Sequence, residues 1–311
     1  MHERFSIPGV DAVTPLSEAA PSILLAKAGL LFDLETVARD GMDADAVHDM
    51  RVASRRLREA IRLLAPAYGD RGLVRWRQRV RAITRALGPV RDADVFVDAL
   101  SSVRLSLGED GQRAAVFLVG YSLGQRDRDL TSLRALLSDI GLVRTRRRFE
   151  RAVRKVRPEA MRGRPLSWLA RDAIAARAEV VLTAQERAVA TGGIVEHHEL
   201  RIAYKRLRYA VEVFAPCYGD AFGDLHDTLR AFQDALGDLQ DMHVFSSIIE
   251  ERYRDGSAAR ADVGRGGLDA VLEAFVPGEQ EALERFGVLT DAHPVDALMR
   301  AMLAPFDENE A

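Results

Sequence analysis

The stretch HDMRVASRRLR, residues 48–58, occurs a second time as HELRIAYKRLR at residues 198–208. Both copies lead into the same ending, which reads APAYGD at 65–70 and APCYGD at 215–220. The offset of 150 positions also relates PLS at 15–17 to PLS at 165–167. Solenoid repeats run to about 20 to 50 residues, so a period this long indicates a duplicated unit of domain size.

A further echo continues the repeat toward the end of each half. The pair LG at 87–88 and the Asp92 that follows it return as LG at 236–237 with Asp241, one residue out of step. Three segments are therefore predicted: an N-terminal extension over 1–14, a first helical repeat over 15–164, and a second helical repeat over 165–311 that ends in an acidic segment.

The predicted fold class is all-α. Apolar residues recur three and four positions apart, as in Leu57, Ile61 and Leu64, and no sustained alternation of apolar and polar residues predicts a strand. Four principal helices are expected in each half. In the first half they cover 16–39, 46–65, 70–107 with a break at Gly88-Pro89, and 110–157 with a break near Gly141, and their counterparts begin near 166, 195, 220 and 262.

The composition is that of a globular protein. Its 311 residues are 48% hydrophobic, which is enough to bury a sizeable core. Cys217 is the only cysteine, which excludes an intramolecular disulfide, indicates a reducing compartment and favours a core position. The N-terminus lacks the apolar segment of a signal peptide, and the longest uncharged apolar stretch, 114–124, is too short to cross a bilayer. We expect a soluble cytoplasmic protein without a membrane partner.

Charge is strongly segregated along the chain, although the net charge is only −3. Residues 48–85 hold eleven arginines and three acids, and residues 144–164 hold ten basic residues and two acids, so each block carries +8. From residue 255 onward, twelve acids stand against four arginines, a balance of −8. Such segregation creates local fields that the net charge conceals, so the acidic balance does not exclude a polyanion partner.

The repeated stretch places its basic residues on one side of a helix. At about 100° per residue, five basic side chains fall within an arc of about 80°, opposite Leu57, Ile61 and Leu64. This first basic face consists of His48, Arg51, Arg55, Arg58 and Arg62. It extends roughly 21 Å at about 1.5 Å per residue. The second basic face consists of His198, Arg201, Lys205 and Arg208, with Glu212 in place of the last arginine.

A basic face of this length suits an extended polyanion better than a single phosphate, which the start of one helix can hold. Arginine meets phosphate oxygens in pairs, and the two histidines are partly charged near neutral pH. The ordinary alternative is a solvated surface helix, but such helices normally mix charges of both signs. Here Glu59 is the only acid within the first arc, and its counterpart is Tyr209.

The same residues carry a family resemblance. The pattern His-x-x-Arg-x-x-x-Arg/Lys-Arg-Leu-Arg, an Ala-Pro-x-Tyr-Gly turn and Leu-Gly-x-x-x-Asp occur in both halves, over about residues 15–303. The chain thereby resembles the conserved histidine α-helical domain (CHAD) family. The resemblance implies two pseudo-symmetric four-helix bundles whose basic faces line a shared central channel. It also implies non-enzymatic binding of inorganic polyphosphate, with no cofactor or metal expected and polyphosphate granules as one location in the cytoplasm.

The resemblance also implies which residues contact phosphate. In the repeated stretches they are His48, Arg51, Arg55, Arg56, Arg58, Arg62, His198, Arg201, Lys205, Arg206 and Arg208. Further positions on the channel wall are Arg77, Arg81, Arg85, His226 and Arg230. Asp234 stands where the first half has Arg85.

Other functions remain open on the sequence alone. Sequence-nonspecific binding of RNA or single-stranded DNA would add aromatic side chains for base stacking. Tyr204 and Tyr209 interleave the second basic face, whereas Ser54 and Glu59 replace them in the first. A polyphosphate-acting enzyme is a further alternative, although the common nucleotide-binding and zinc-hydrolase motifs are absent. So is the Glu-x-Glu-x-Lys motif of the CYTH triphosphatase domain that some CHAD proteins carry. A third alternative is a structural partner protein whose acidic tail docks on a basic face or gates the channel.

Two groups of side chains have alternative interpretations. Asp92, Asp94 and Asp241 follow a glycine, and they either cap a helix start or pair with arginines, or hold a divalent cation that bridges phosphates. At 197–199, His-His-Glu are adjacent in sequence, so on a helix they point in different directions and are not expected to bind a metal.

Overall fold

The computed structural model describes residues 5–41, 43–69, 73–156, 161 and 163–307. Within these residues the chain is helical, with one isolated β-bridge and no strand, so the all-α prediction is confirmed. The predicted helix limits at 70 and 157 lie outside the described residues, as do the first four residues of the N-terminal extension and 308–311 of the acidic segment.

The first half follows the predicted order of helices with one exception. Its helices are α1 (Leu16–Asp33), α2 (Glu35–Asp40), α3 (Ala44–Leu63), α4 (Val74–Val103), α5 (Glu109–Ile140) and α6 (Leu142–Val153). The break near Gly141 is confirmed, because this glycine is left-handed (φ +60°) between α5 and α6. The predicted break at Gly88-Pro89 is wrong, since both residues lie inside α4. Their neighbours Leu87 and Val90 are fully buried, and this packing offsets the helix hydrogen bond that a proline removes.

The second half presents the same order of long helices. Its helices are α8 (Leu166–Thr191), α9 (Ile194–Val213), α10 (Phe222–Arg254), α11 (Ser257–Arg260), α12 (Arg265–Ala292) and α13 (Val295–Asp307). The four longest begin within three residues of their predicted starts. Short 3₁₀ helices at Ala65–Tyr68 and Ala215–Cys217 follow α3 and α9 at the repeated Ala-Pro turn. The duplication and the domain boundaries stay predictions.

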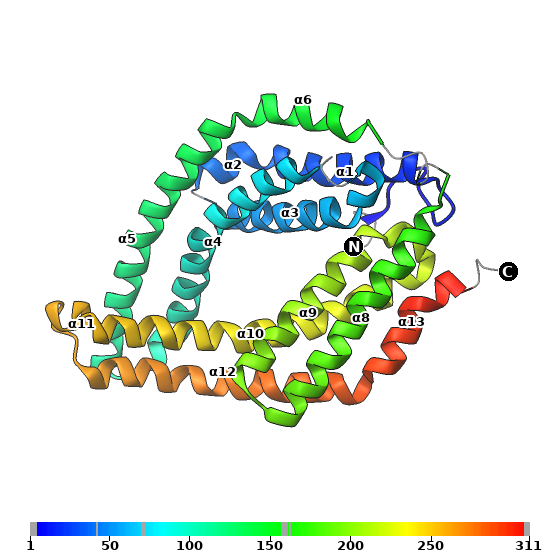
Figure 1. The fold of residues 1–311 in the computed structure, drawn as a ribbon. Coiled ribbons are helices and arrows are strands. Elements are labelled where there is room, and N and C mark those ends of the chain that lie inside the picture. Colours follow the sequence, from blue (N-terminus) through cyan, green and yellow to red (C-terminus); the bar gives the residue numbers. More distant parts are fainter. Residues whose placement is uncertain (1–4, 42, 70–72, 157–160, 162, 308–311) are drawn as a thin grey trace.

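The two halves are joined by helix packing and by a backbone bridge (Figure 1). At one end α3 packs against α9, and at the other end α5 and α4 pack against α12. The starts of the halves also pair directly. The N–H of Leu16 donates to the carbonyl of Arg164 at 2.8 Å, and the N–H of Leu166 donates to the carbonyl of Thr14 at 2.9 Å. This reciprocal pair fixes the starts of α1 and α8 side by side.

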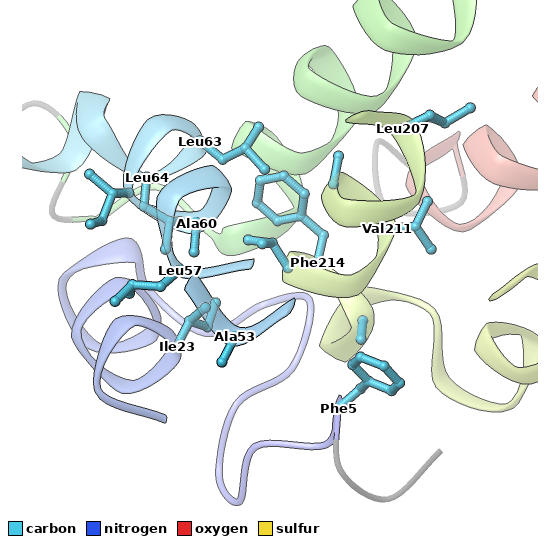
Figure 2. Close-up of a cluster of buried hydrophobic side chains, with 14 of the residues drawn as sticks. Phe5, Ile23, Ala53, Leu57, Ala60, Leu63, Leu64, Leu207, Val211 and Phe214 are labelled. Atoms are coloured by element: carbon cyan, nitrogen blue, oxygen red, sulfur yellow. The ribbon is translucent and has the colours of Figure 1, made fainter. Parts of the chain in front are cut away.

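Two clusters of buried hydrophobic side chains stabilise this arrangement. The larger cluster includes the apolar sides of α3 and α9, and Figure 2 shows Phe214, which follows α9, beside Ala60 and Leu63 of α3. The smaller cluster lies toward the far ends of the long hairpins, where the rings of Phe96 and Phe245 are 5.0 Å apart. Both clusters contain residues from both halves, so the two halves share their hydrophobic cores and are not independent folding units.

Two predictions about buried side chains are confirmed. Cys217 is buried in the larger cluster, as expected for a core thiol. Leu57, Ile61 and Leu64, which the helical spacing placed opposite the first basic face, are also buried. In the described part of the chain, no helix combines the length and the apolar character that crossing a bilayer requires.

Candidate functional site

Helix α3 presents the first basic face because its other side is fixed by packing. The carboxylate of Asp43 caps its start and accepts hydrogen bonds from the N–H groups of Asp45 at 2.8 Å and Ala46 at 3.2 Å. Met50, Leu57 and Ile61 are at most 1% exposed and face the core. The arginines between them therefore point to the opposite side, toward α9 and the start of α4.

The basic faces of α3 and α9 converge on one pocket with α4. It has a volume of about 440 Å³, and we call it the basic pocket. It is lined by Arg55, Arg58, Glu59, Arg62, Arg77, Arg81, Ile202, Lys205, Arg206 and Tyr209. Seven of these ten described residues are cationic and Glu59 alone is acidic, so the pocket carries a strong positive potential. All seven cations were among the predicted phosphate contacts.

Two half-buried arginines, Arg51 and Arg201, extend this positive region from the basic pocket along α3 and α9. Burial and the neighbouring Arg55 lower the pKa of Arg51, and burial likewise lowers the pKa of Arg201. The charge of Arg51 is partly compensated, because its Nη2 lies 3.0 Å from a carboxylate oxygen of Asp92. The Nε atoms of Arg51 and Arg201 are buried without a hydrogen-bond partner among the described residues. A buried donor that lacks an acceptor lowers the stability of the folded state.

Lys205 is the least compensated charge of the site. Burial, followed by the charges of Arg201, Arg55, Arg51 and Arg208, lowers the pKa of Lys205 to about 6. Within the described chain no carboxylate forms an ion pair with it. The nearby Asp241 is itself half-buried, and the loss of hydration raises the pKa of Asp241. An anion bound here would replace the missing counter-charge and favour the protonated amine.

A second cluster of charges surrounds Glu212 and contains three of the predicted phosphate contacts. Glu212 is 1% exposed, and Arg56 donates to its two oxygens at 2.6 and 3.0 Å. Arg208 donates to the same carboxylate, and Nε2 of His226 lies 3.2 Å from it. Burial alone would raise the pKa of Glu212, but its contact with His226 and the charges of Arg56 and Arg208 hold it at about 2. Arg208 and His226 are buried and Arg56 is half-buried, and none of the three is among the described residues that line the basic pocket.

The remaining predicted contacts differ in their surroundings. Arg62 lines the pocket but also pairs with Glu59 at 2.6 Å. Arg85 is exposed and is not among the residues that line the basic pocket, and Arg230 pairs with Asp234 at 3.4 Å.

The two histidines that open the basic faces are exposed and do not line the basic pocket. Nδ1 of His198 contacts the side-chain oxygen of Gln240. Loss of part of its hydration and the charge of the nearby Arg91 lower the pKa of His48, which makes His48 less charged at neutral pH than its sequence position suggested.

One contributor was missed in the sequence. Arg177 of α8 donates to Glu59 at 3.1 Å and so neutralises the one acid among the described residues that line the basic pocket. Arg177 stands 150 positions after Lys27, so the repeat offset relates two basic residues that lie outside the basic faces. Comparing the halves position by position outside the repeated stretch would have drawn attention to both.

The aromatic residues of the second basic face are not available for base stacking. Tyr204 is fully buried, its hydroxyl donates to Gln185 at 2.7 Å, and its ring stacks on Phe232. Tyr209 is only 6% exposed and lies under the guanidinium of Arg208, although one edge reaches the basic pocket. Proteins that bind single strands without sequence preference use exposed rings for this contact.

Two of the carboxylates near the repeated glycine pair with arginines, which was one of the expectations for them. Asp92 pairs with Arg51 and Asp94 with Arg126. Neither caps a helix start, because both lie inside α4. Across the described residues, no group of three or more histidine, cysteine, aspartate or glutamate side chains is arranged to hold a metal ion.

The fold and the site together define an all-α protein with a cationic pocket among α3, α4 and α9. The sequence model of the CHAD domain matches residues 23–250, so the chain belongs to the CHAD domain family. The fold is similar to the crystal structure of the CHAD domain from the plant Ricinus communis, with 21% identity, coverage of 96% of this chain and 95% of that chain, and a TM-score of 0.67. It is also similar to PptA from Streptomyces chartreusis, with 16% identity, coverage of 89% and 100%, and a TM-score of 0.64. No match was found among curated proteins.

Proposed function

We propose that this protein binds inorganic polyphosphate in the basic pocket without chemically altering it. The observation that carries the proposal is the group of seven cations around one pocket, with a single acid that Arg62 and Arg177 already neutralise. Membership of the CHAD family supports the same function. Each phosphate that enters would replace solvent counterions and find arginine forks already in place.

A polymer fits this arrangement better than a single phosphate. From Arg51 to Arg62, α3 rises by about 16 Å, and cationic side chains accompany it along the whole distance. Lys205 and Arg206 face this row from α9, while Arg77 and Arg81 face it from α4. A small anion would satisfy only a few of these donors, whereas a chain of phosphates would satisfy donors on all three helices at once.

The test is a competition experiment at several salt concentrations. Long-chain polyphosphate competes with single-stranded RNA for the wild type and for the triple variant Arg55→Gln, Arg58→Gln and Lys205→Met. We expect the wild type to prefer polyphosphate and the triple variant to lose at least tenfold in affinity, with a shallower dependence on salt. A matched control is a triple variant with Arg104→Gln, Arg128→Gln and Arg254→Gln, which replaces the same number of basic residues at exposed positions away from the pocket.

Several outcomes would contradict the proposal. Equal or stronger binding of RNA by the wild type would favour the nucleic-acid alternative. Unchanged polyphosphate affinity of the pocket variant would place the site elsewhere. For the non-enzymatic part, sustained release of phosphate from polyphosphate, with and without a divalent cation, would show that the protein is an enzyme.

The expected location follows from the same binding. If the basic pocket holds polyphosphate in the cell, the protein should collect at polyphosphate granules in the cytoplasm. A fluorescent fusion of the wild type should then co-localise with the granules, and the pocket variant should be diffuse. A wild type that stays diffuse in cells rich in granules would argue against this location.

A further inference from the structure

The second basic block of the sequence forms a surface that the basic pocket does not use. On α6, the packing side consists of Thr145, Phe149 and Val153, all buried. The opposite side carries four exposed arginines, which we call the outer basic surface: Arg144, Arg147, Arg148 and Arg151. Within the described chain none of the four forms an ion pair with a carboxylate, so their charge is directed to solvent.

Two acids beside α6 pair with an arginine that is not part of the outer basic surface. Arg146, which lies between the four arginines in sequence, contacts Asp33 of α1 at 2.7 Å and Glu150 of α6 at 3.0 Å. Arg146 thus forms ion pairs with both carboxylates. Surface helices normally balance their charges through neighbours three or four residues apart, and α6 leaves its outer arginines unbalanced.

Packing holds α6 firmly next to the start of α4. The ring of Phe149 meets the ring of Trp76 edge-on at 5.3 Å, and the hydroxyl of Tyr68 donates to the carbonyl of Val153 at 2.8 Å. The guanidinium groups of Arg75 and Arg79 lie 5.3 and 5.4 Å from the centre of the Trp76 ring. This side of α4 is therefore both cationic and attached to α6.

The first turns of α4 connect the two cationic regions. Arg77 and Arg81 line the basic pocket, whereas Arg75 and Arg79 surround the tryptophan that contacts α6. These four arginines alternate over seven residues, or about 9 Å of helix. A flexible polyanion that leaves the basic pocket past Arg77 would meet positive charge on the way to α6. Figure 1 shows α6 on the outer side of the first half, above α1.

We propose that the outer basic surface binds the part of a long polyphosphate chain that extends beyond the basic pocket. This inference rests on the proposed function. The two surfaces would then act on one polymer, and the second contact would raise affinity through a high effective concentration. A lipid surface is a poorer partner, because Phe149 and Val153 of α6 are buried and, among the described side chains of this helix, Val143 is the one large apolar residue exposed for insertion into a membrane.

The test compares short and long polyphosphate. In the variant Arg144→Gln, Arg147→Gln, Arg148→Gln and Arg151→Gln, we expect affinity for long-chain polyphosphate to fall at least fivefold, and affinity for tripolyphosphate to change less than twofold. The dependence of long-chain binding on salt should become shallower, by about one charge for each phosphate that the substituted arginines no longer neutralise. The control variant Arg104→Gln, Arg128→Gln, Arg254→Gln and Arg260→Gln removes the same charge from other exposed positions, and it should bind both ligands as the wild type does.

Each remaining outcome is decisive. Wild-type affinity of the α6 variant for the long chain would overturn the inference, as would an equal fall in affinity of the control variant, which would reduce the effect to net charge. An effect confined to single-stranded RNA would assign the surface to nucleic acid and also overturn it. A wild type that binds neither length of polyphosphate would refute the proposed function itself. That result can be distinguished from a failure of the α6 inference, because it is seen with the wild type alone, before any variant is compared.

Discussion

Replacing Lys205 by methionine is expected to stabilise the ligand-free protein and to weaken its binding of polyphosphate. Methionine has a similar length and keeps the space filled, but it removes an amine that lies among Arg51, Arg55, Arg201 and Arg208. The structure gives this amine no carboxylate partner within its described residues. Binding sites that stay ready for a charged ligand often cost stability in this way.

The magnitude follows from the pKa of Lys205. With a pKa of about 6 against an ordinary value of 10.5, Lys205 is mostly neutral at pH 7 in the folded state and charged in the unfolded state. At about 1.36 kcal/mol per pH unit, giving up this proton on folding costs roughly 5 kcal/mol. Screening by solvent reduces the gain expected from Lys205→Met to about 2–4 kcal/mol.

The same amine makes the stability of the protein depend on pH. Below pH 6 it is charged in both states and its penalty on folding is largest, and the penalty disappears as the pH rises through 10.5. Lys205 therefore makes the stability of the wild type increase with pH across this window. The Lys205→Met protein lacks this contribution.

The assay is urea unfolding at pH 7 and pH 9.5, with polyphosphate affinity measured in parallel. Lys155→Met is the matched control, because Lys155 is exposed, and its stability should stay within about 0.5 kcal/mol of the wild type. We expect Lys205→Met to gain stability at pH 7, to gain less at pH 9.5, and to lose at least tenfold in affinity. A variant that is less stable than the wild type at pH 7 would refute the description of Lys205 as an uncompensated charge.

Three further predictions separate the roles of the charged residues. Glu212→Gln should lower the free energy of unfolding by about 3 kcal/mol at pH 7, because a carboxylate with a pKa of about 2 against an ordinary 4.5 stabilises the fold above pH 4.5. This stabilisation is lost as the pH falls toward 2. Urea unfolding at pH 7 and pH 4 measures the effect, and a destabilisation that does not shrink at pH 4 contradicts the prediction. Arg56→Gln should lower the free energy of unfolding by about 2–4 kcal/mol and leave polyphosphate affinity within twofold. Arg55→Gln should instead weaken polyphosphate binding and leave the free energy of unfolding nearly unchanged. Urea unfolding and binding titrations compare the two variants, and the same behaviour in both would mean that one site holds both arginines. Polyphosphate binding at pH 7.5 should be accompanied by uptake of close to one proton in the wild type and of none in Lys205→Met. Calorimetry in buffers of different ionisation enthalpy measures this proton uptake, and equal uptake in the two proteins would assign the proton to another group.

The long helices were predictable because their signals are local. The spacing of Leu57, Ile61 and Leu64 identified the buried side of α3, and Gly141 marked the break between α5 and α6. The predicted break at Gly88-Pro89 failed because packing around Leu87 and Val90 outweighs the preference of a proline for a helix end. That packing depends on residues far along the chain, which a local signal does not contain.

The candidate site was only partly predictable for the same reason. Helical spacing grouped Arg55, Arg58 and Arg62 on one face, and the structure brings them together in the basic pocket. Spacing alone cannot tell which arginine of α3 meets a carboxylate of α9, and so it did not separate Arg56 from Arg55. The contact between Arg56 and Glu212 joins residues 156 positions apart, and only the crossing of α3 and α9 determines it.

The departure from the repeat at Glu212 explains how one arrangement serves both stability and binding. Glu212 stands where the first basic face has Arg62, and its carboxylate binds Arg56 of α3 and Arg208 of α9. An acid at this one position therefore holds the two basic helices together, although their remaining charges repel each other. The ion pair is buried and its partners are fixed, so the repulsion among Lys205, Arg55 and Arg201 is not relieved by separation of the helices. A bound polyanion can relieve it instead, which links the stability of the α3–α9 contact to the occupancy of the basic pocket.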